Sequence, residues 1–139
     1  MSGGAATLGP AEWRDLVRQA NLFFTVVSDS MRPSFRKGDE VLLVPFDAPP
    51  RPGQVLAYFR HADQMLVTHR YHGQGRFRGD NALAFDPPVA DADIVALVAK
   101  VRRGGLEFPV PPRTPLPAQL RRLRKWLTAR WTAQKLRHG

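Results

Sequence analysis

The chain has 139 residues, enough for one domain of ordinary size. Hydrophobic residues make up 43% and charged residues 24%, a balance typical of a folded protein rather than a disordered one. The absence of cysteine excludes disulfide bonds, a cysteine nucleophile and cysteine-ligated zinc. No stretch approaches the roughly 20 apolar residues of a membrane-spanning helix. The N-terminus lacks the basic start and apolar core of a secretory signal, so we expect a cytoplasmic protein.

The net charge of +9 is unevenly distributed along the chain. All 12 acidic residues, but only 13 of the 21 basic residues, lie before residue 112. The segment from residue 112 to 139 therefore carries nearly all of the excess charge. A protein that binds nucleic acid through its folded body carries basic charge on that body. The nearly neutral body of this chain argues against nucleic acid as a partner.

The elements follow from hydrophobic periodicity and turn residues. Residues 1–10 are small and glycine-rich, which predicts a flexible N-terminus. In residues 11–20 apolar side chains recur at helical spacing, which predicts a short helix. A brief helix is expected after Ser30, because Pro33 suits a first helical turn. Six strands are predicted from apolar, aromatic and β-branched runs, at residues 22–27, 40–46, 54–59, 65–71, 76–80 and 94–102. This pattern indicates a mainly β fold with a mostly antiparallel sheet.

We expect one domain over residues 11–106, followed by a different kind of segment. Residues 107–139 are predicted to hold a proline-rich linker and a basic amphipathic helix, because leucines and tryptophan recur every three to four residues among arginines and lysines. Three roles remain open for this helix. It packs on the sheet, it binds anionic lipid peripherally through Trp126 and Trp131, or it contacts nucleic acid.

The residue types of a nucleophilic hydrolase occur beside the predicted strands. Ser30 follows the first strand, His69 lies within the fourth, Asp80 ends the fifth, and Asp86 follows it. A serine, an imidazole base and an orienting carboxylate are the parts of such a site. Each also has a purely structural interpretation: the serine as a helix cap, the histidine as a core residue, and residues 79–81 as a turn.

We expect no metal ion and no cofactor. His69 and His72 point to opposite faces of their strand, so they do not form a ligand pair. The other candidate cluster, His61-Ala62-Asp63, lies at the tip of a predicted hairpin and offers too few ligands for a closed metal site.

Four motifs, in order, resemble those of the signal peptidase and LexA-type peptidase superfamily. They are Ser28–Pro33 with Gly38-Asp39, the strand entry Pro52–Val55, the pair His69-Arg70, and Gly79-Asp80-Asn81 with Asp86. The resemblance extends from about residue 23 to residue 101, most of the predicted domain. Because a histidine stands at the base position, the chain resembles the endoplasmic-reticulum and archaeal-type signal peptidases rather than the serine–lysine branch.

The resemblance implies a signal-peptidase-like β domain and a serine endopeptidase that cleaves a precursor or leader peptide. It makes Ser30 the nucleophile, His69 the general base and Asp86 the residue that orients the histidine, with Asp80 beside the site. Ser28 and the backbone N–H of Ser30 are expected to line the oxyanion hole. A neutral imidazole accepts a proton near pH 7, because its reference pKa is about 6.5. Activity is therefore expected to rise through that range.

Two departures from the family pattern favour an alternative. Asp29 stands where the family usually has glycine between its two serines, and no membrane anchor is predicted. The chain thus resembles the short, soluble members of the superfamily, with peripheral contact at the inner face of an anionic membrane as one option for the basic helix. The alternative function is a non-catalytic module that binds peptide or membrane on the same fold.

Overall fold

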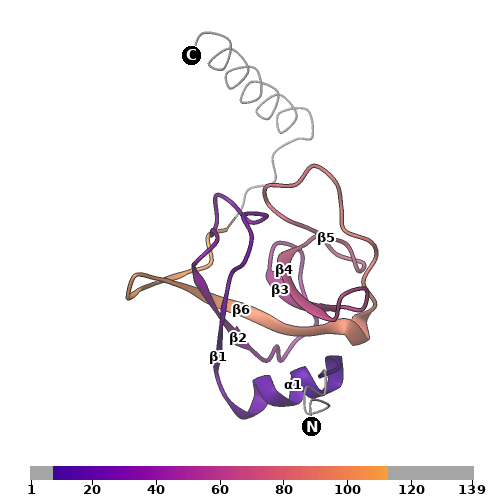
Figure 1. Ribbon diagram of the computed structural model, residues 1–139. Coiled ribbons are helices and arrows are strands. Elements are labelled where there is room, and N and C mark those ends of the chain that lie inside the picture. The colour runs from indigo at the N-terminus through magenta and orange to yellow at the C-terminus, as the bar shows by residue number, and fades with distance from the viewer. Residues whose placement is uncertain (1–7, 113–139) are drawn as a thin grey trace.

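The structure is a computed structural model that describes residues 8–112. Figure 1 shows a short helix lying against a curled antiparallel sheet. The predicted basic amphipathic helix and most of the predicted flexible N-terminus lie outside the described residues. Within residues 8–112, no helix is long and apolar enough to cross a membrane.

Helix α1, Pro10–Gln19, forms where the helical spacing predicts it. Pro10 occupies the first turn, where its missing N–H costs no helical hydrogen bond. The apolar face holds Val17, which is fully buried, and Trp13. The Trp13 ring packs edge-on against Phe24, with 5.5 Å between the ring centroids. This apolar face anchors the helix to the sheet.

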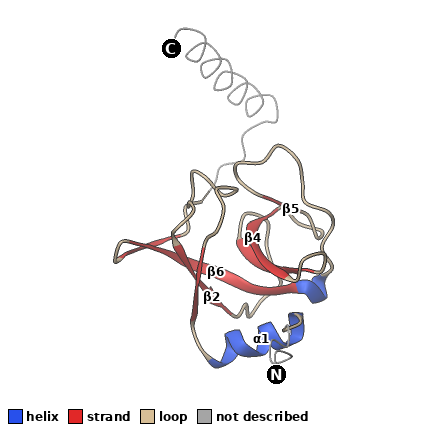
Figure 2. Cartoon of the chain, viewed as in Figure 1, coloured by secondary structure: helices blue, strands red, loops and turns tan. Residues whose placement is uncertain are grey.

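Within residues 8–112, seven strands form one sheet in which every pairing is antiparallel. They are β1 (Leu22–Thr25), β2 (Glu40–Val44), β3 (Val55–Arg60), β4 (Met65–Tyr71), β5 (Phe77–Arg78), β6 (Ile94–Arg103) and β7 (Leu106–Pro109). Their order is β1-β2-β6-β3-β4-β5, and β7 pairs with β6. Strand β6 pairs with β3 near its start and with β2 and β7 toward its end, and the sheet curls into a half-barrel (Figure 2). The mainly antiparallel β fold class is confirmed.

In the part of the chain that the structure describes, two apolar clusters lie on the two faces of the curled sheet. One cluster joins Met31 and Phe35, from the segment after β1, to side chains of β2, β3 and β6. The other gathers around Phe77 and includes Tyr58. Alternate residues of β3 belong to the two clusters, so this strand is buried along all but its last residue. The hairpin of β3 and β4 is therefore held from both sides.

The segment after Ser30 differs from the brief helix that the sequence predicts. It forms consecutive turns. Pro33 has no N–H to donate, and the N–H groups of Ser34 and Phe35 both bond to the carbonyl of Met31, at 2.9 and 3.3 Å. Two donors that share one acceptor do not build the regular hydrogen-bond ladder of a helix. The side chain of Phe35 is fully buried, which ties the end of this segment to the core.

Strand β7 and a short 3₁₀ helix, Asp91–Asp93, are not predicted by the sequence analysis. Gly104 and Gly105, which follow the predicted sixth strand, form the turn of a hairpin between β6 and β7. Both glycines have positive φ angles, 56° and 82°, as a two-residue hairpin turn requires. The predicted fifth strand, residues 76–80, is shortened to β5.

Candidate active site

Ser30 lies in the turn that follows β1, and the loop after β5 closes on its backbone. The N–H of Asn81 donates to the carbonyl oxygen of Ser30 at 2.9 Å. Gly79 lies so close to the same carbonyl that a Cβ atom would stand 2.5 Å from the oxygen, so no side chain fits there. The Gly79-Asp80-Asn81 motif therefore helps to fix the position of Ser30.

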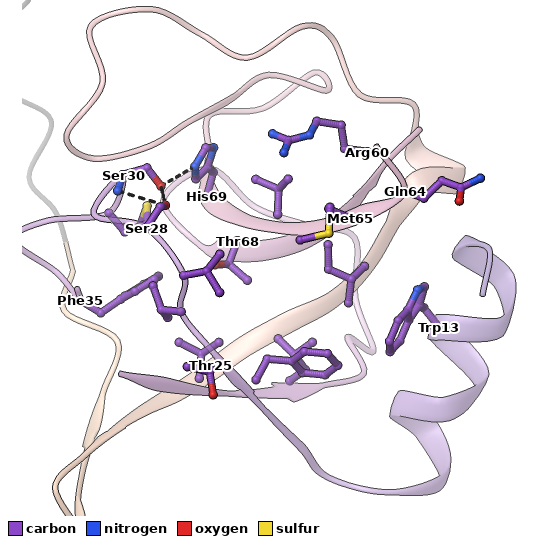
Figure 3. Close-up of a pocket in the computed structure, with 18 residues that line it drawn as sticks. Trp13, Thr25, Ser28, Ser30, Phe35, Arg60, Gln64, Met65, Thr68 and His69 are labelled. Atoms are coloured by element: carbon purple, nitrogen blue, oxygen red, sulfur yellow. Dashed lines mark hydrogen bonds between the residues drawn. The ribbon is translucent and has the colours of Figure 1, made fainter. Parts of the chain in front are cut away.

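His69 lies in β4, in register with Leu56 of β3, and its side chain is 13% exposed. Its Nε2 atom is 2.9 Å from Ser30 Oγ, within hydrogen-bond distance (Figure 3). Its other ring nitrogen, Nδ1, is 2.6 Å from Asp86 Oδ2. Three side chains that are far apart in the sequence thus form one continuous chain of hydrogen bonds.

Asp86 is carried by the loop after β5, where its N–H donates to the carbonyl of Phe77 at 2.8 Å. The hydroxyl of Tyr58 donates to Asp86 Oδ2 at 2.6 Å, the same oxygen that contacts His69. Burial opposes ionisation of Asp86, but the hydrogen bonds from His69 and Tyr58 outweigh it and lower the pKa of the carboxyl. Burial, together with this carboxylate, raises the pKa of the Tyr58 hydroxyl, which therefore keeps its proton and acts as a donor.

Asp80 lies in a buried network with Ser34 and Arg70. Its Oδ2 accepts hydrogen bonds from Ser34 Oγ at 2.6 Å and from Arg70 Nη2 at 2.7 Å, and its side chain is only 2% exposed. The carboxylate of Asp86 contacts the His69 ring. The structure therefore places Asp80 in a buried ion pair beside the site, the position that the resemblance implies.

Arg70, the cation of this buried pair, also contacts distant parts of the chain. Its guanidinium donates to the carbonyl oxygens of Gly53 and Pro111, at 2.9 and 3.1 Å, in addition to Asp80 and Ser34. Because Arg70 directly follows His69 in β4, these contacts fix the end of the strand that carries the histidine.

Ser28 and the N–H of Ser30, the predicted oxyanion-hole donors, lie beside the Ser30 hydroxyl. Ser28 Oγ is 3.1 Å from Ser30 Oγ, and the Ser30 N–H points to Ser28 Oγ at the long distance of 3.5 Å (Figure 3). The structure therefore brings both predicted donors to the same end of the groove.

The carboxylate of Asp29 is engaged outside this site. Its Oδ1 accepts hydrogen bonds from the backbone N–H of Lys37 and from Arg32 Nε, both at 3.0 Å. The Lys37 N–H, followed by Arg32, lowers the pKa of the carboxyl. Asp29 does not line the groove beside Ser30, and its side chain is 49% exposed. The departure from the family pattern therefore leaves the groove free of this charge.

An apolar groove of about 620 Å³ extends from Ser30 and His69 toward Trp13 of α1 (Figure 3). It is lined by residues 24–28, which include the end of β1, and by residues 64–69, which include most of β4. Strand β4 pairs with β3 along nearly its whole length but with β5 only at its last two residues. In the described part of the chain, the groove edge of β4 thus lacks a partner strand.

No group of three or more histidine, aspartate and glutamate side chains in residues 8–112 is arranged to hold a metal ion. In the predicted hairpin-tip cluster, His61 and Asp63 contact different residues. His61 Nε2 lies 2.9 Å from Asp93 Oδ1, and Asp63 accepts two hydrogen bonds from Arg60.

Sequence reasoning missed Tyr58 and Ser34, which contact the two aspartates. Alternation within β3 places Tyr58 on one apolar face, and a buried tyrosine hydroxyl needs a hydrogen-bond partner. The sequence contains no signal that identifies this partner as Asp86, because the partner comes from a loop 28 residues later.

No protein-family model matches the chain, and no curated protein matches it.

Proposed function

We propose that this protein is a serine endopeptidase similar to the histidine-type signal peptidases. The observation that carries the proposal is the chain of hydrogen bonds from Ser30 through His69 to Asp86, with distances of 2.9 and 2.6 Å. A hydroxyl is a weak nucleophile until a neighbouring base takes its proton. An imidazole whose second nitrogen contacts a carboxylate is the base that serine hydrolases of several folds use.

Cleavage would proceed through an acyl-enzyme. Ser30 Oγ attacks the carbonyl carbon of the scissile bond while His69 Nε2 takes the hydroxyl proton, and the Asp86 carboxylate stabilises the resulting imidazolium. His69 then gives this proton to the leaving nitrogen, the carbon–nitrogen bond breaks, and an ester remains on Ser30. A water molecule, losing a proton to His69, attacks the ester. The proton returns to Ser30 Oγ as the acid product leaves.

The attacked carbonyl oxygen develops negative charge that needs hydrogen-bond donors. The Ser28 hydroxyl and the Ser30 N–H lie beside the nucleophile and would supply them. The Ser30 N–H makes only a 3.5 Å contact with Ser28 Oγ in the free protein. When an oxyanion forms, this N–H would exchange a weak hydrogen bond for a strong one.

The groove supports an extended segment of a precursor or leader peptide as the substrate. A peptide strand would add to the free edge of β4, since main-chain hydrogen bonds hold extended peptides to such edges. His69 lies four residue steps after Met65, about 13 Å of strand at roughly 3.3 Å per residue. The groove would therefore contact about four substrate residues beside the cleaved bond, and its apolar lining would favour apolar side chains.

The test is cleavage of a proteome-derived peptide pool, followed by mass spectrometry of the products. Wild type should generate new peptide ends, and Ser30→Ala should generate none while keeping the wild-type unfolding midpoint. Ser34→Ala is the matched control, because Ser34 lies in the same turn but bonds to Asp80. Its free energy of unfolding should fall by about 1–3 kcal/mol, because the substitution leaves a buried hydrogen-bond partner unsatisfied. It should retain turnover per folded molecule.

Two results would reject the proposal. Equal turnover by wild type and Ser30→Ala would exclude Ser30 as the nucleophile. Tight binding of peptides by both proteins without any product would instead favour the alternative, a non-catalytic peptide-binding module.

A further inference from the structure

We infer that Tyr58 is a positioning residue that holds the Asp86 carboxylate in contact with His69. The inference rests on the proposed function, because it assigns a role within the same site. It adds a fourth residue, from a different strand, to the chain of hydrogen bonds that begins at Ser30.

Two donors converge on one atom of Asp86. The Tyr58 hydroxyl and His69 Nδ1 each lie 2.6 Å from Oδ2. In the register of the hairpin, Leu56 is opposite His69 and Tyr58 is opposite Val67, so Tyr58 and His69 share one face of β3 and β4. The two donors thus approach Asp86 from adjacent strands.

Tyr58 is fixed more firmly than the residue it contacts. Its side chain is buried in the second core cluster, and its ring lies 4.7 Å from the ring of Phe77. Asp86, by contrast, belongs to a loop without helix or strand, between β5 and the 3₁₀ helix. A hydrogen bond to the imidazole alone would leave the carboxylate free to rotate about its side-chain bonds, whereas a second bond from a rigid strand selects one orientation.

Besides His69, Arg60 is a charged side chain that acts on Asp86. The guanidinium of Arg60, which is paired with Asp63, adds an attraction that lowers the pKa of Asp86, after burial and the bonds from His69 and Tyr58. Tyr58 contributes no net charge. Replacing it by phenylalanine therefore removes one hydrogen bond and keeps both the ring and the charge balance.

The chain offers a matched control in Tyr71. This tyrosine is also buried in the second cluster, with its ring 5.1 Å from Phe77. Its hydroxyl accepts a long 3.5 Å hydrogen bond from the N–H of Gly75 and does not contact Asp86. Tyr71→Phe and Tyr58→Phe thus make the same chemical change at sites of similar burial.

The first experiment measures kcat and KM of both variants on the best peptide from the pool. Tyr58→Phe should lower kcat about tenfold to a hundredfold with little change in KM, the range expected for a lost hydrogen bond to a charged group. Tyr71→Phe should leave both constants near the wild-type values. In the Asp86→Ala background, Tyr58→Phe should cause no further loss, because Tyr58 acts through Asp86. Losses that multiply would overturn the positioning role.

The second experiment needs no substrate. In ¹⁵N-labelled protein, the proton on His69 Nδ1 should give a low-field NMR signal that is absent from His69→Gln. Tyr58→Phe should broaden or shift this signal, whereas Tyr71→Phe should leave it unchanged. An unchanged signal in Tyr58→Phe, or no signal in wild type, would overturn the inference. If wild type cleaves no peptide, the proposed function fails, and this NMR result still decides whether Tyr58 holds Asp86 against His69.

Discussion

Asp80 and Asp86 lie on the same loop, six residues apart, yet they have opposite kinds of partner. Asp80 is 2% exposed and is bound by Arg70, whose charge does not change at physiological pH. Asp86 is 16% exposed and is bound by His69, and histidine is a residue type that often serves as an acid or a base. A carboxylate beside a permanent cation stabilises structure, whereas a carboxylate beside an imidazole supports proton transfer. On the proposed function, Asp80 contributes to stability and Asp86 to activity.

The largest expected effect is the loss of activity in Asp86→Asn. An asparagine can donate a hydrogen bond to the imidazole and so favour the wrong tautomer, which lowers kcat by about 10⁴-fold in a serine–histidine–aspartate protease. Peptide cleavage by the purified variant measures this loss, and the unfolding midpoint should stay close to that of wild type. Asp47→Asn, at an exposed aspartate away from the groove, is the control and should retain full activity. Full activity of Asp86→Asn would remove the distinction between the two aspartates.

The next effect is a loss of stability in Asp80→Ala. Truncation leaves the guanidinium of Arg70, 4% exposed, without its carboxylate, and breaking a buried ion pair in this way costs about 3–5 kcal/mol. Urea unfolding measures this free energy. Replacing both partners by apolar residues of similar size should recover part of it. Wild-type stability combined with lost turnover would show that Asp80 acts in catalysis, against the comparison.

A smaller effect concerns the pH dependence of stability. The pKa of Asp86 in the folded protein lies below its ordinary value of 3.8, so the folded state favours the carboxylate more than the unfolded state does. Its contribution is fully present above the unfolded pKa and is lost as the pH falls through the folded pKa. Wild type should therefore lose stability relative to Asp86→Asn below about pH 4. Urea unfolding between pH 2 and pH 7 measures the difference, and a relative gain for wild type at low pH would contradict the shift.

Much of the fold could be predicted because its signals are local. The alternation in Met65–Tyr71 and the short connection before it predict the hairpin that carries His69, and β4 has the predicted bounds. The prediction of a brief helix after Ser30 is wrong. The burial of Phe35 and the shared acceptor at Met31 override the local preference for a helix. Strand β7 is missed because Gly104 and Gly105 signal a hairpin turn as well as the end of a strand.

The candidate site also contains residues that the sequence predicts and residues that it does not. Ser30, His69 and Asp86 could be named from the order and spacing of their motifs. Which aspartate contacts the histidine could not be derived from the residues alone, because the loop between Asp80 and Asp86 has no periodic pattern. Tyr58 could not be found at all, since its partner lies 28 residues away and depends on how the sheet curls.

The most direct test of the central claim compares Ser30→Ala, His69→Ala and the double variant on one peptide substrate. If Ser30 and His69 act as one unit, each single substitution should remove nearly all of the chemical rate enhancement, and the double variant should be no slower than either. Losses that multiply in the double variant, or turnover that survives in Ser30→Ala, would contradict a hydroxyl activated by this histidine.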